Sequence, residues 1–224
     1  RVLTFGEAAD STVRVSRVDA TGPRVSFQLS YLGQNASVTL QIPGHHNALN
    51  AAGAVAVLVG HGFDFEQSCK AVESFGGTVR RFELHGVVRG VSVYDDFAHH
   101  PTEVAAALTA ARAAVGQGRL ITVFQPHLFS RTRIFAAEFA QALALSDQVI
   151  VTDIYAARED PEPGVTGALI ADLVSDRSKV HYVPEWDDVA DKAAALAQTG
   201  DFIVTMGCGD IFRMVPELLT ALED

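Results

Sequence analysis

The chain has 224 residues, of which 48% are hydrophobic and 20% are charged, and its formal net charge is −10. This charge argues against nucleic acid as the main partner, because contacts to a phosphate backbone need clustered Lys and Arg; a phosphorylated small molecule needs only a few local cations. No apolar run approaches the roughly 18 residues of a membrane span, and Cys69 and Cys208 form no CxxC pair. We therefore expect a cytoplasmic globular protein with a hydrophobic core and no membrane partner.

The first part of the sequence reads as strands followed by helices. Apolar and polar residues alternate over residues 1–43, and two alternating runs flank Gly33-Gln34-Asn35, which predicts a β-hairpin. The pattern becomes helical at HHNALNAAGAVAVLVGHG (45–62), and DFEQSCKAVESF (64–75) predicts a second helix capped by Asp64.

A pair of glycines, Gly76 and Gly77, suits a linker between two domains. We place the domain boundary there, with a first part at residues 1–76 and a second at residues 77–224. Because the chain opens directly in the strand-like run RVLTFG, we expect a fragment whose upstream partner is missing.

The second part alternates strands with helices of roughly ten or more residues, which predicts an α/β fold with a mostly parallel sheet and right-handed crossovers. We expect strands at Val87–Tyr94, Leu120–Phe124, Gln148–Ile154, Val180–Val183 and Phe202–Met206. Helices are expected to begin near Pro101, Arg131, Thr166 and Asp187, and after Asp210. In the helix from Pro101, an apolar face is formed by Val104, Leu108, Ala111 and Val115.

Polar residues gather where these strands end, which is where open parallel sheets bind ligands. The ends read DDFAHHP (95–101), FQPHLFSRT (124–132), Asp153 to Tyr155, and MGCGD (206–210). They place Asp95, Asp96, His99, His100, His127 and Arg131 on one edge of the sheet. Three other interpretations stay open: the acids only cap a turn, the two histidines are a surface pair, or Cys208 only packs. The spacing matches no sharp metal motif, so we assign no metal ligand.

Two further groups suit a nucleotide. In GHHNALNAAGA (44–54), His46, Asn47 and Asn50 cluster at a helix start, where amides can read a planar heterocycle; helix capping by Asn is the alternative. RRF (80–82) offers two guanidiniums to a phosphate or, alternatively, a solvated basic patch. The sequence contains no phosphate loop of the form GxxxxGK[ST], and no GxGxxG motif follows a predicted strand. The residues alone indicate a two-part α/β chain with a polar cleft for an anionic ligand.

Four motifs occur in a fixed order: GHHNALNAAGAVAV, FGGTVRRFE, VYDDFAHHPTEV and FQPHLFSRT, followed by MGCGDIF. Together they resemble the Mur ligases of peptidoglycan synthesis. The resemblance implies that residues 1–76 are the end of a central ATPase domain and that residues 77–224 are the whole Rossmann-like C-terminal domain. It also implies that the phosphate loop, the main Mg²⁺ ligands and the UDP site lie upstream of this chain.

The family reaction is an ATP-dependent amide synthesis through an acyl phosphate. The motifs favour the branch that joins L-alanine to UDP-N-acetylmuramate, and the fragment alone is expected to be inactive. The runner-up within the family is the branch that attaches a whole tripeptide to the same sugar nucleotide. A third possibility is a non-catalytic module that closes on a nucleotide held by a partner.

The resemblance also implies roles for single residues. The adenine contacts would come from His46, Asn47 and Asn50, a phosphate contact from Arg81, and an ATP-side contact from Asp96. Beside the reacting carboxyl and the incoming alanine it places His99, which with Asp96 stands nearest the chemistry. The alanine carboxylate would be held by Arg131, helped by His127.

Two positions depart from the family pattern. Leu128 stands where many alanine-specific members have a second Arg, and Phe97 stands where many have Tyr. The carboxylate clamp is therefore expected to rest on Arg131, and any hydroxyl contact at position 97 is lost.

Overall fold

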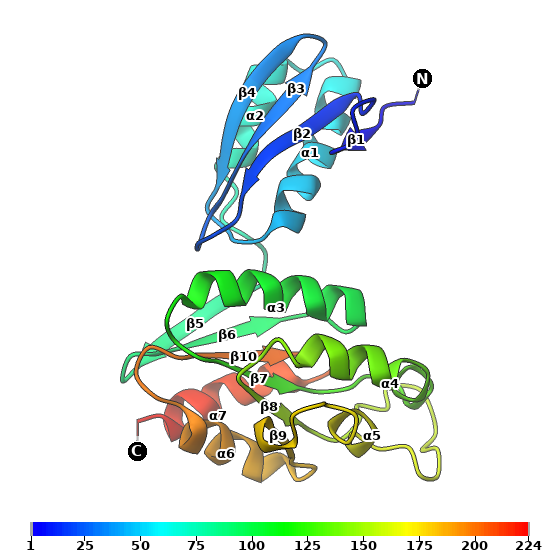
Figure 1. The fold of residues 1–224 in the computed structure, drawn as a ribbon, viewed down its shortest axis with the longest axis vertical. Helices are drawn as coiled ribbons and strands as arrows, with labels where there is room; N and C mark the ends of the chain where they lie inside the picture. The colour runs from blue at the N-terminus through cyan, green and yellow to red at the C-terminus, as the bar shows by residue number, and fades with distance from the viewer. Residues whose placement is uncertain (1, 224) are drawn as a thin grey trace. The chain divides into compact units, whose positions relative to one another are not determined.

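The computed structural model describes residues 2–223, which divide into two units between Gly77 and Thr78 (Figure 1). Within residues 2–77, the first unit has a sheet of four strands in the order β1-β2-β3-β4 and two helices. Its elements are β1 (Phe5–Gly6), β2 (Val13–Asp19), β3 (Val25–Tyr31), β4 (Gln34–Leu40), α1 (His45–Gly60) and α2 (Phe65–Glu73).

Buried and partly exposed side chains alternate along the strands of the first sheet, and the buried ones define the face that packs on the helices. On β3, Val25, Phe27 and Leu29 are buried against the helices, and the residues between them are partly exposed. The predicted hairpin is confirmed, but its turn consists of Leu32 and Gly33, both at positive φ, whereas Gln34 and Asn35 already belong to β4. The predicted cap of the second helix is confirmed as well, because the Asp64 side chain accepts a hydrogen bond from the backbone N–H of Gln67 at 2.9 Å.

The second unit confirms the predicted α/β fold with a mostly parallel sheet. Within residues 78–223, six strands lie in the order β5-β6-β10-β7-β8-β9, and every neighbouring pair is parallel except β5 with β6. The strands are β5 (Glu83–Val88), β6 (Val91–Asp96), β7 (Leu120–Phe124), β8 (Gln148–Val151), β9 (Val180–Tyr182) and β10 (Phe202–Met206). The helices are α3 (Pro101–Val115), α4 (Phe129–Leu143), α5 (Ala168–Ala171), α6 (Val189–Leu196) and α7 (Met214–Ala221).

One predicted strand is wrong. The run Val87–Tyr94 is not a single strand but contains the turn of the β5–β6 hairpin, formed by Arg89 and Gly90 at φ 49° and 79°. Two consecutive left-handed residues are the requirement of a tight hairpin turn. Arg at the first of these positions hides the turn, because Asn or Asp is the usual residue there.

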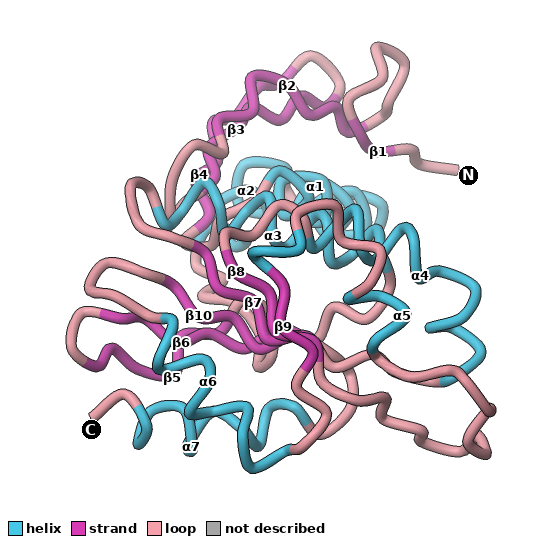
Figure 2. The backbone as a smooth tube through the Cα atoms, turned by 60° about the horizontal axis from the view of Figure 1, so that its bottom comes forward, coloured by secondary structure: helices cyan, strands magenta, loops and turns pink. Residues whose placement is uncertain are grey.

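Helices cover both faces of this sheet (Figures 1 and 2). On one face, α3, α4 and α5 pack on Leu120 and Phe124 of β7. On the other, α6 and α7 pack on Ile121 and Val123 of the same strand. A strand that is buried on both faces reads as a continuous apolar run, which is why LITVF was recognisable from the sequence.

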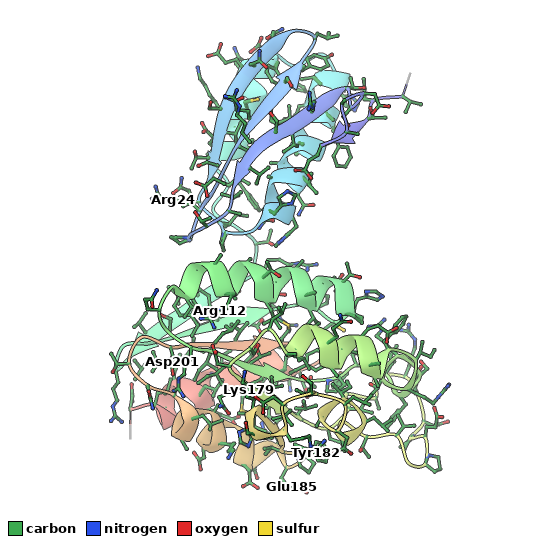
Figure 3. All side chains as sticks on the ribbon, viewed as in Figure 1. Arg24, Arg112, Lys179, Tyr182, Glu185 and Asp201 are labelled. Carbon is green, nitrogen blue, oxygen red and sulfur yellow. The ribbon has the colours of Figure 1, made fainter. Side chains whose placement is uncertain are left out.

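Ion pairs tie the loops at the amino-terminal ends of the strands, near Arg112 and Asp201 (Figure 3). Arg119 Nη2 lies 2.6 Å from Asp201 Oδ2, and Arg112 pairs with Asp147. Burial alone would raise the pKa of Asp201, but hydrogen bonds from Arg119 and from backbone N–H groups hold this pKa below its ordinary value. These ion pairs lie at the edge of the sheet opposite the one where the parallel strands end.

The buried face of α3 gives a stability test. Leu108 is fully buried between the helix and the sheet, so Leu108→Ala should lower the free energy of unfolding by about 3 kcal/mol through lost burial and a residual cavity. Leu145→Ala, at a side chain that is 43% exposed, is the matched control and should cost under about 1 kcal/mol. Urea denaturation of both variants measures the two values, and equal values would contradict the packing described.

Candidate functional site

The ends of four parallel strands lie level. Met206 of β10 is in register with Asp96 of β6 and with Phe124 of β7, and Phe124 is in register with Val151 of β8. The segments that follow these strands therefore leave from one edge of the sheet. We call the ends of these strands and the segments after them, residues 95–100, 206–210, 124–131 and 151–155, the rim.

Asp95 lies at the base of the rim and is fully buried. One of its carboxylate oxygens accepts a hydrogen bond from Arg80 Nε at 2.7 Å, and the other accepts one from Thr205 Oγ1 at 2.7 Å. A buried carboxylate is tolerated only when it is paired in this way. Asp95 thus serves to hold its neighbours and faces no ligand.

Asp96 is also buried, with 5% of its surface exposed. Its Oδ2 accepts from the backbone N–H of Phe82 at 2.9 Å, and its Oδ1 accepts from that of Ala98 at 2.8 Å. Burial raises the pKa of Asp96, against the lowering effect of these two hydrogen bonds and of the nearby Arg81. Asp96 therefore fixes the segments on both sides of it, while each oxygen keeps a lone pair for a further donor.

The two adjacent histidines differ in role. His100 is the N-cap of α3: its Nδ1 accepts from the backbone N–H of Thr102 at 3.3 Å, and Glu103 accepts in return from the backbone N–H of His100 at 3.3 Å. This reciprocal capping gives His100 a structural role. Of the pair, His99 is the one left for chemistry.

His99 has a defined tautomer. Its Nδ1 lies 3.0 Å from the carbonyl oxygen of Phe97, which can only accept, so Nδ1 carries the proton. With the proton on Nδ1, an uncharged ring offers the lone pair of Nε2 as an acceptor or a base. The ring stands edge-on to Phe97, with centroids 5.3 Å apart.

His127 and Arg131 lie beside His99. The Arg131 Nη1 donates to the backbone oxygen of His99 at 3.3 Å and lies 3.5 Å from His127 Nδ1. The His127 ring stacks on Tyr155 at 5.8 Å and is 6.2 Å from the ring of His99. Burial first, then the charge of Arg131, lowers the pKa of His127, so its ring is neutral at pH 7. The structure thus brings these three predicted residues together.

The two arginines of RRF are not equivalent. Arg80 is only 17% exposed at its side chain and is engaged by Asp95. Arg81 is exposed and its guanidinium lies 5.6 Å from the Phe97 ring. This guanidinium donates no hydrogen bond within the part of the chain that the structure describes, and only the backbone N–H of Arg81 does so, to Thr78 at 3.2 Å. Of the two, Arg81 is therefore the guanidinium that can take an anion.

The amino-terminal turn of α4 has an anchor that the sequence did not reveal. Leu128 precedes the helix with φ 71° and offers no capping side chain. Instead Glu159 accepts from the backbone N–H of Ser130 at 2.9 Å and from the Ser130 hydroxyl. Glu159 belongs to the loop-like segment AREDPEPG, where no local pattern marks it as a helix cap.

The other predicted nucleotide group lies in the first unit. Asn47 Nδ2 donates to the backbone oxygen of Pro43 at 2.7 Å, and Asn50 Nδ2 approaches Asn47 Oδ1 at 3.4 Å. Gly44 is the N-cap of α1, and no side chain caps this helix start, so Asn47 closes the preceding turn and is not a cap. His46, in the same first turn, is partly exposed.

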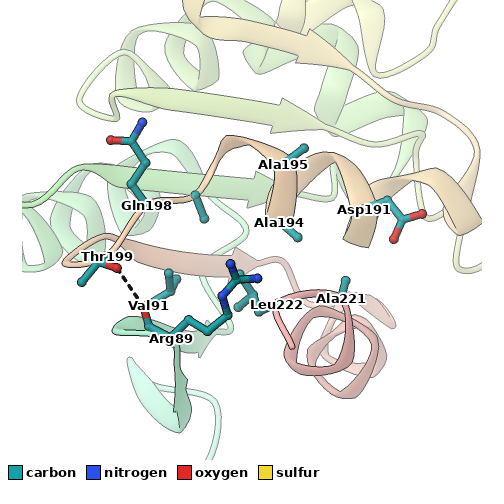
Figure 4. A pocket seen from close by; sticks show the side chains of 10 residues that line it. Arg89, Val91, Asp191, Ala194, Ala195, Gln198, Thr199, Ala221 and Leu222 are labelled. Carbon is teal, nitrogen blue, oxygen red and sulfur yellow. Dashed lines mark hydrogen bonds between the residues drawn. The ribbon is translucent and has the colours of Figure 1, made fainter. Parts of the chain in front are cut away.

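A groove of the second unit lies away from the rim (Figure 4). It is an open groove of about 620 Å³ whose lining includes Arg89, Val91, Asp191, Gln198, Thr199 and Leu222. Val91 begins β6, so the groove lies at the amino-terminal ends of the strands. The convergent histidines and Arg131 make the rim the stronger candidate site.

Within residues 2–223, no three or more His, Cys, Asp or Glu side chains gather in a way that would hold a metal ion. Among these described residues there is also no helix long and apolar enough to span a membrane.

A polar rim at the carboxyl ends of a Rossmann-like sheet is typical of α/β domains that bind ligands, and comparison with known proteins shows the family to which this domain belongs. Residues 80–209 match the family described as Mur ligase, glutamate ligase domain. The chain therefore belongs to the Mur ligase family, which confirms the resemblance of its motifs.

Two curated relatives match the chain along nearly its whole length. The UDP-N-acetylmuramate--L-alanine ligase of Clavibacter michiganensis is 54% identical over 224 residues, covering 100% of this chain and 47% of the relative. That of Thermobifida fusca is 47% identical over 231 residues, covering 99% of this chain and 49% of the relative. The chain thus spans about half the length of these curated relatives.

Comparison with solved structures also finds ligases of this family. The UDP-N-acetylmuramate-alanine ligase of Thermotoga maritima superposes with a TM-score of 0.78 at 25% identity, over 97% of this chain and 47% of that one. A murein peptide ligase of Psychrobacter arcticus gives 0.69 at 27% identity, over 99% and 46%.

The charge of Arg131 should be measurable at His127. Arg131→Met should raise the pKa of the His127 ring toward its ordinary value, because one of the causes that lower it is removed. In the unfolded chain the His127 ring has a pKa of about 6.5, and in the folded protein its pKa is lower. The free energy of unfolding therefore decreases as pH falls from about 6.5 to the folded pKa. In Arg131→Met the two pKa values are closer, so this decrease should be smaller.

Imidazole NMR titration of wild type and Arg131→Met measures the shift. Arg133→Met is the matched control, since Arg133 lies on the same helix but pairs with Glu162 at 2.9 Å. An unchanged His127 pKa in Arg131→Met would refute the electrostatic contact.

Proposed function

We propose that this chain is the C-terminal half of an ATP-dependent ligase that joins L-alanine to UDP-N-acetylmuramate through an acyl phosphate, in peptidoglycan synthesis. The observation that carries the proposal is the 54% identity, along the whole chain, to a relative named for that reaction. The rim supports it, because it presents a guanidinium and two imidazoles where an amino acid would bind.

The two units suit the two domains that such a ligase would contribute here. In this proposal the first unit, about residues 1–76, is the end of the central ATP-binding domain, and residues 77–224 are the Rossmann-like C-terminal domain. The division between Gly77 and Thr78, and a family match that lies wholly in the second unit, support this assignment.

At the nucleotide, we assign adenine contacts to His46, Asn47 and Asn50, and a phosphate contact to Arg81. The side-chain amides of Asn47 and Asn50 follow one another along α1, as a group that reads a planar heterocycle requires. Arg81 is the exposed guanidinium of its pair. Asp96 would act from the ATP side, with the oxygen lone pairs that its two backbone hydrogen bonds leave available.

At the amino acid, we assign the carboxylate of L-alanine to Arg131, with His127 beside it. A guanidinium pairs a carboxylate through two parallel N–H groups, which fixes the direction of the amine. His99 then lies next to that amine. Its Nε2 lone pair can take the proton that an ammonium must lose before nitrogen attacks the acyl phosphate.

Phosphoryl transfer needs Mg²⁺ to offset charge on the phosphates. The residues described here form no metal-binding cluster of their own, so in this proposal the main Mg²⁺ ligands belong to the rest of the ligase. What this chain supplies is orientation, a phosphate-facing guanidinium and a proton acceptor.

We also propose a cytoplasmic location. Cys69 and Cys208 are both free thiols, as is usual in a reducing compartment. The consumption of ATP requires the same compartment.

The tripeptide-attaching branch is the second candidate. A murein peptide ligase shares the fold at 27% identity, and VYDDFAHHPT fits both branches. Between the two solved structures, the one named for alanine has the slightly lower identity, 25%, but the higher TM-score, 0.78 against 0.69. Curated relatives named for L-alanine reach 54% and 47% identity along the chain, and we therefore prefer the single amino acid.

The reaction is tested by phosphate release from the full-length ligase that carries this chain, with ATP, Mg²⁺ and UDP-N-acetylmuramate. We expect release on addition of L-alanine and none with the L-Ala-γ-D-Glu-diaminopimelate tripeptide. Release only with the tripeptide would move the protein to the other branch, and release with neither would favour a non-catalytic module. Residues 1–224 alone are the control and should release no phosphate.

The carboxylate clamp is tested by Arg131→Ala in the same ligase. Loss of a charged hydrogen-bond partner should raise the KM for L-alanine by about 10- to 100-fold and leave the KM for ATP nearly unchanged. Arg133→Ala removes a more exposed guanidinium from the same helix and should behave as wild type. An Arg131→Ala enzyme with an unaltered KM for L-alanine would remove Arg131 from the site.

A further inference from the structure

The segment Arg80–Phe82 is held in a conformation that the backbone does not adopt freely. Arg80 and Phe82 have φ of 59° and 50°, in the left-handed region where a side chain is strained. The strain is balanced by hydrogen bonds: the backbone N–H of Arg80 donates to Glu83 at 2.7 Å, that of Phe82 donates to Asp96, and the oxygen of Arg80 accepts from Phe97 at 2.8 Å. The segment is therefore fixed to the end of β6.

The side chain of Arg80 bridges Asp95 on β6 and the segment that follows β10. Its Nε donates to Asp95 at 2.7 Å, its Nη2 donates to the carbonyl oxygen of Gly207 at 2.7 Å, and its Nη1 approaches that of Gly209 at 3.5 Å. Each of the three guanidinium nitrogens thus has a partner in the protein. Such a fork is specific to Arg, because the ammonium of Lys has one nitrogen.

Two aromatic rings also lie against this guanidinium. Its carbon lies 5.0 Å from the ring centre of Phe97 and 4.6 Å from that of Phe212, which are distances of cation–π contact. With its three nitrogens bonded and its side chain only 17% exposed, Arg80 has little left to offer a phosphate.

The Gly207–Gly209 turn is tightly confined on its other sides. A Cβ at Gly207 would lie 2.8 Å from the backbone oxygen of Gln125, and one at Gly209 would lie 2.6 Å from the ring of Tyr155. The backbone N–H of Gly207 donates to Asp96 at 3.1 Å. The Gly207–Gly209 turn therefore has little room to move, and Arg80 binds the carbonyl groups of Gly207 and Gly209 in this position.

Cys208 lies between the two carbonyls that Arg80 binds. Burial raises the pKa of the Cys208 thiol, while the charge of Arg131 and a hydrogen bond from it act in the opposite direction. The connection to Arg131 runs through packed rings. A Cβ at Gly209 would lie 2.6 Å from the Tyr155 ring, this ring stacks on that of His127 with centroids 5.8 Å apart, and Arg131 Nη1 lies 3.5 Å from His127 Nδ1. The contacts therefore run from β6 through Arg80, the Gly207–Gly209 turn, Tyr155 and His127 to Arg131.

We propose that Arg80 is a positioning residue that connects the nucleotide side of the rim, at Asp95 and Asp96, with its amino acid side, at Cys208 and Arg131. It acts through the Gly207–Gly209 turn and touches neither ATP nor amino acid. This role deepens the proposed ligase function and rests on it where substrate kinetics are concerned.

The test compares Arg80→Lys with Arg81→Lys in the full-length ligase. Lys at position 80 keeps a positive charge near the buried Asp95 but cannot bond the aspartate and both glycine carbonyls at once. Lys at position 81 is the matched control, because it makes the same chemical change one residue away on an exposed side chain. If Arg80→Lys does not fold, Arg80→Met with Asp95→Asn removes both charges of the buried pair together.

The first readout does not depend on activity. Alkylation of single cysteines, followed by peptide mass spectrometry, should show Cys208 reacting about tenfold faster in Arg80→Lys than in wild type, the order expected for loss of a charged hydrogen bond. Arg81→Lys should leave the rate within about twofold. Cys69, buried in the first unit, reports unfolding of that unit and should stay slow in all proteins.

The second readout separates positioning from contact. Arg80→Lys should raise the KM for L-alanine about tenfold with little change in the KM for ATP, since the displaced group is Arg131. Arg81→Lys should show the reverse. A rise only in the KM for ATP would make Arg80 a nucleotide contact, and wild-type values of both KM and the Cys208 rate would leave it no positioning role; either result overturns the proposal.

Failure of the two proposals can be told apart. If the wild-type ligase releases no phosphate with L-alanine, the proposed function fails, yet the Cys208 rate still decides whether Arg80 holds the turn. If phosphate is released but the Cys208 rate is the same in Arg80→Lys as in wild type, the positioning role fails and the function stands.

Discussion

The level ends of β6, β10, β7 and β8 are the constraint on which the site depends. Parallel pairing fixes the register along the whole strand, so Met206 aligns Asp96 with Phe124 and, through it, Val151. Side chains that are far apart in sequence then emerge at one edge. A slip of one residue on any of these strands would reverse its buried faces and withdraw its part of the rim.

This arrangement has an electrostatic cost, because it buries two adjacent carboxylates at the end of β6. The cost is offset by named donors: Arg80 and Thr205 for Asp95, and backbone N–H groups for Asp96. No buried side-chain N or O within residues 2–223 lacks a partner. A fully satisfied polar network of this kind makes a unique arrangement, as the proposed role of orienting an amine toward an acyl phosphate would require.

Much of the fold could be read from the sequence, because buried parallel strands carry a strong apolar signal; β7 and β10 have the bounds predicted. The β5–β6 turn was missed since Arg89 occupies a left-handed position usually held by Asn. Strand ends and motifs predicted which segments form the candidate site. They did not predict which side chains within it hold the structure and which remain available to a ligand. Arg80 and Arg81, or His99 and His100, are neighbours of one type, and only the direction of each side chain separates structural partners from groups available to a ligand.

The strand order also sets when the second unit can fold. β10 is the last strand in the chain, yet it lies between β6 and β7 and pairs with both. Until Phe202–Met206 has left the ribosome, the nascent chain has β5–β6 and β7–β9 as two separate pieces with exposed apolar edges. Completion of the sheet therefore waits until residue 206 has been synthesised, and a chain shortened before residue 202 would leave β6 and β7 without the strand that joins them.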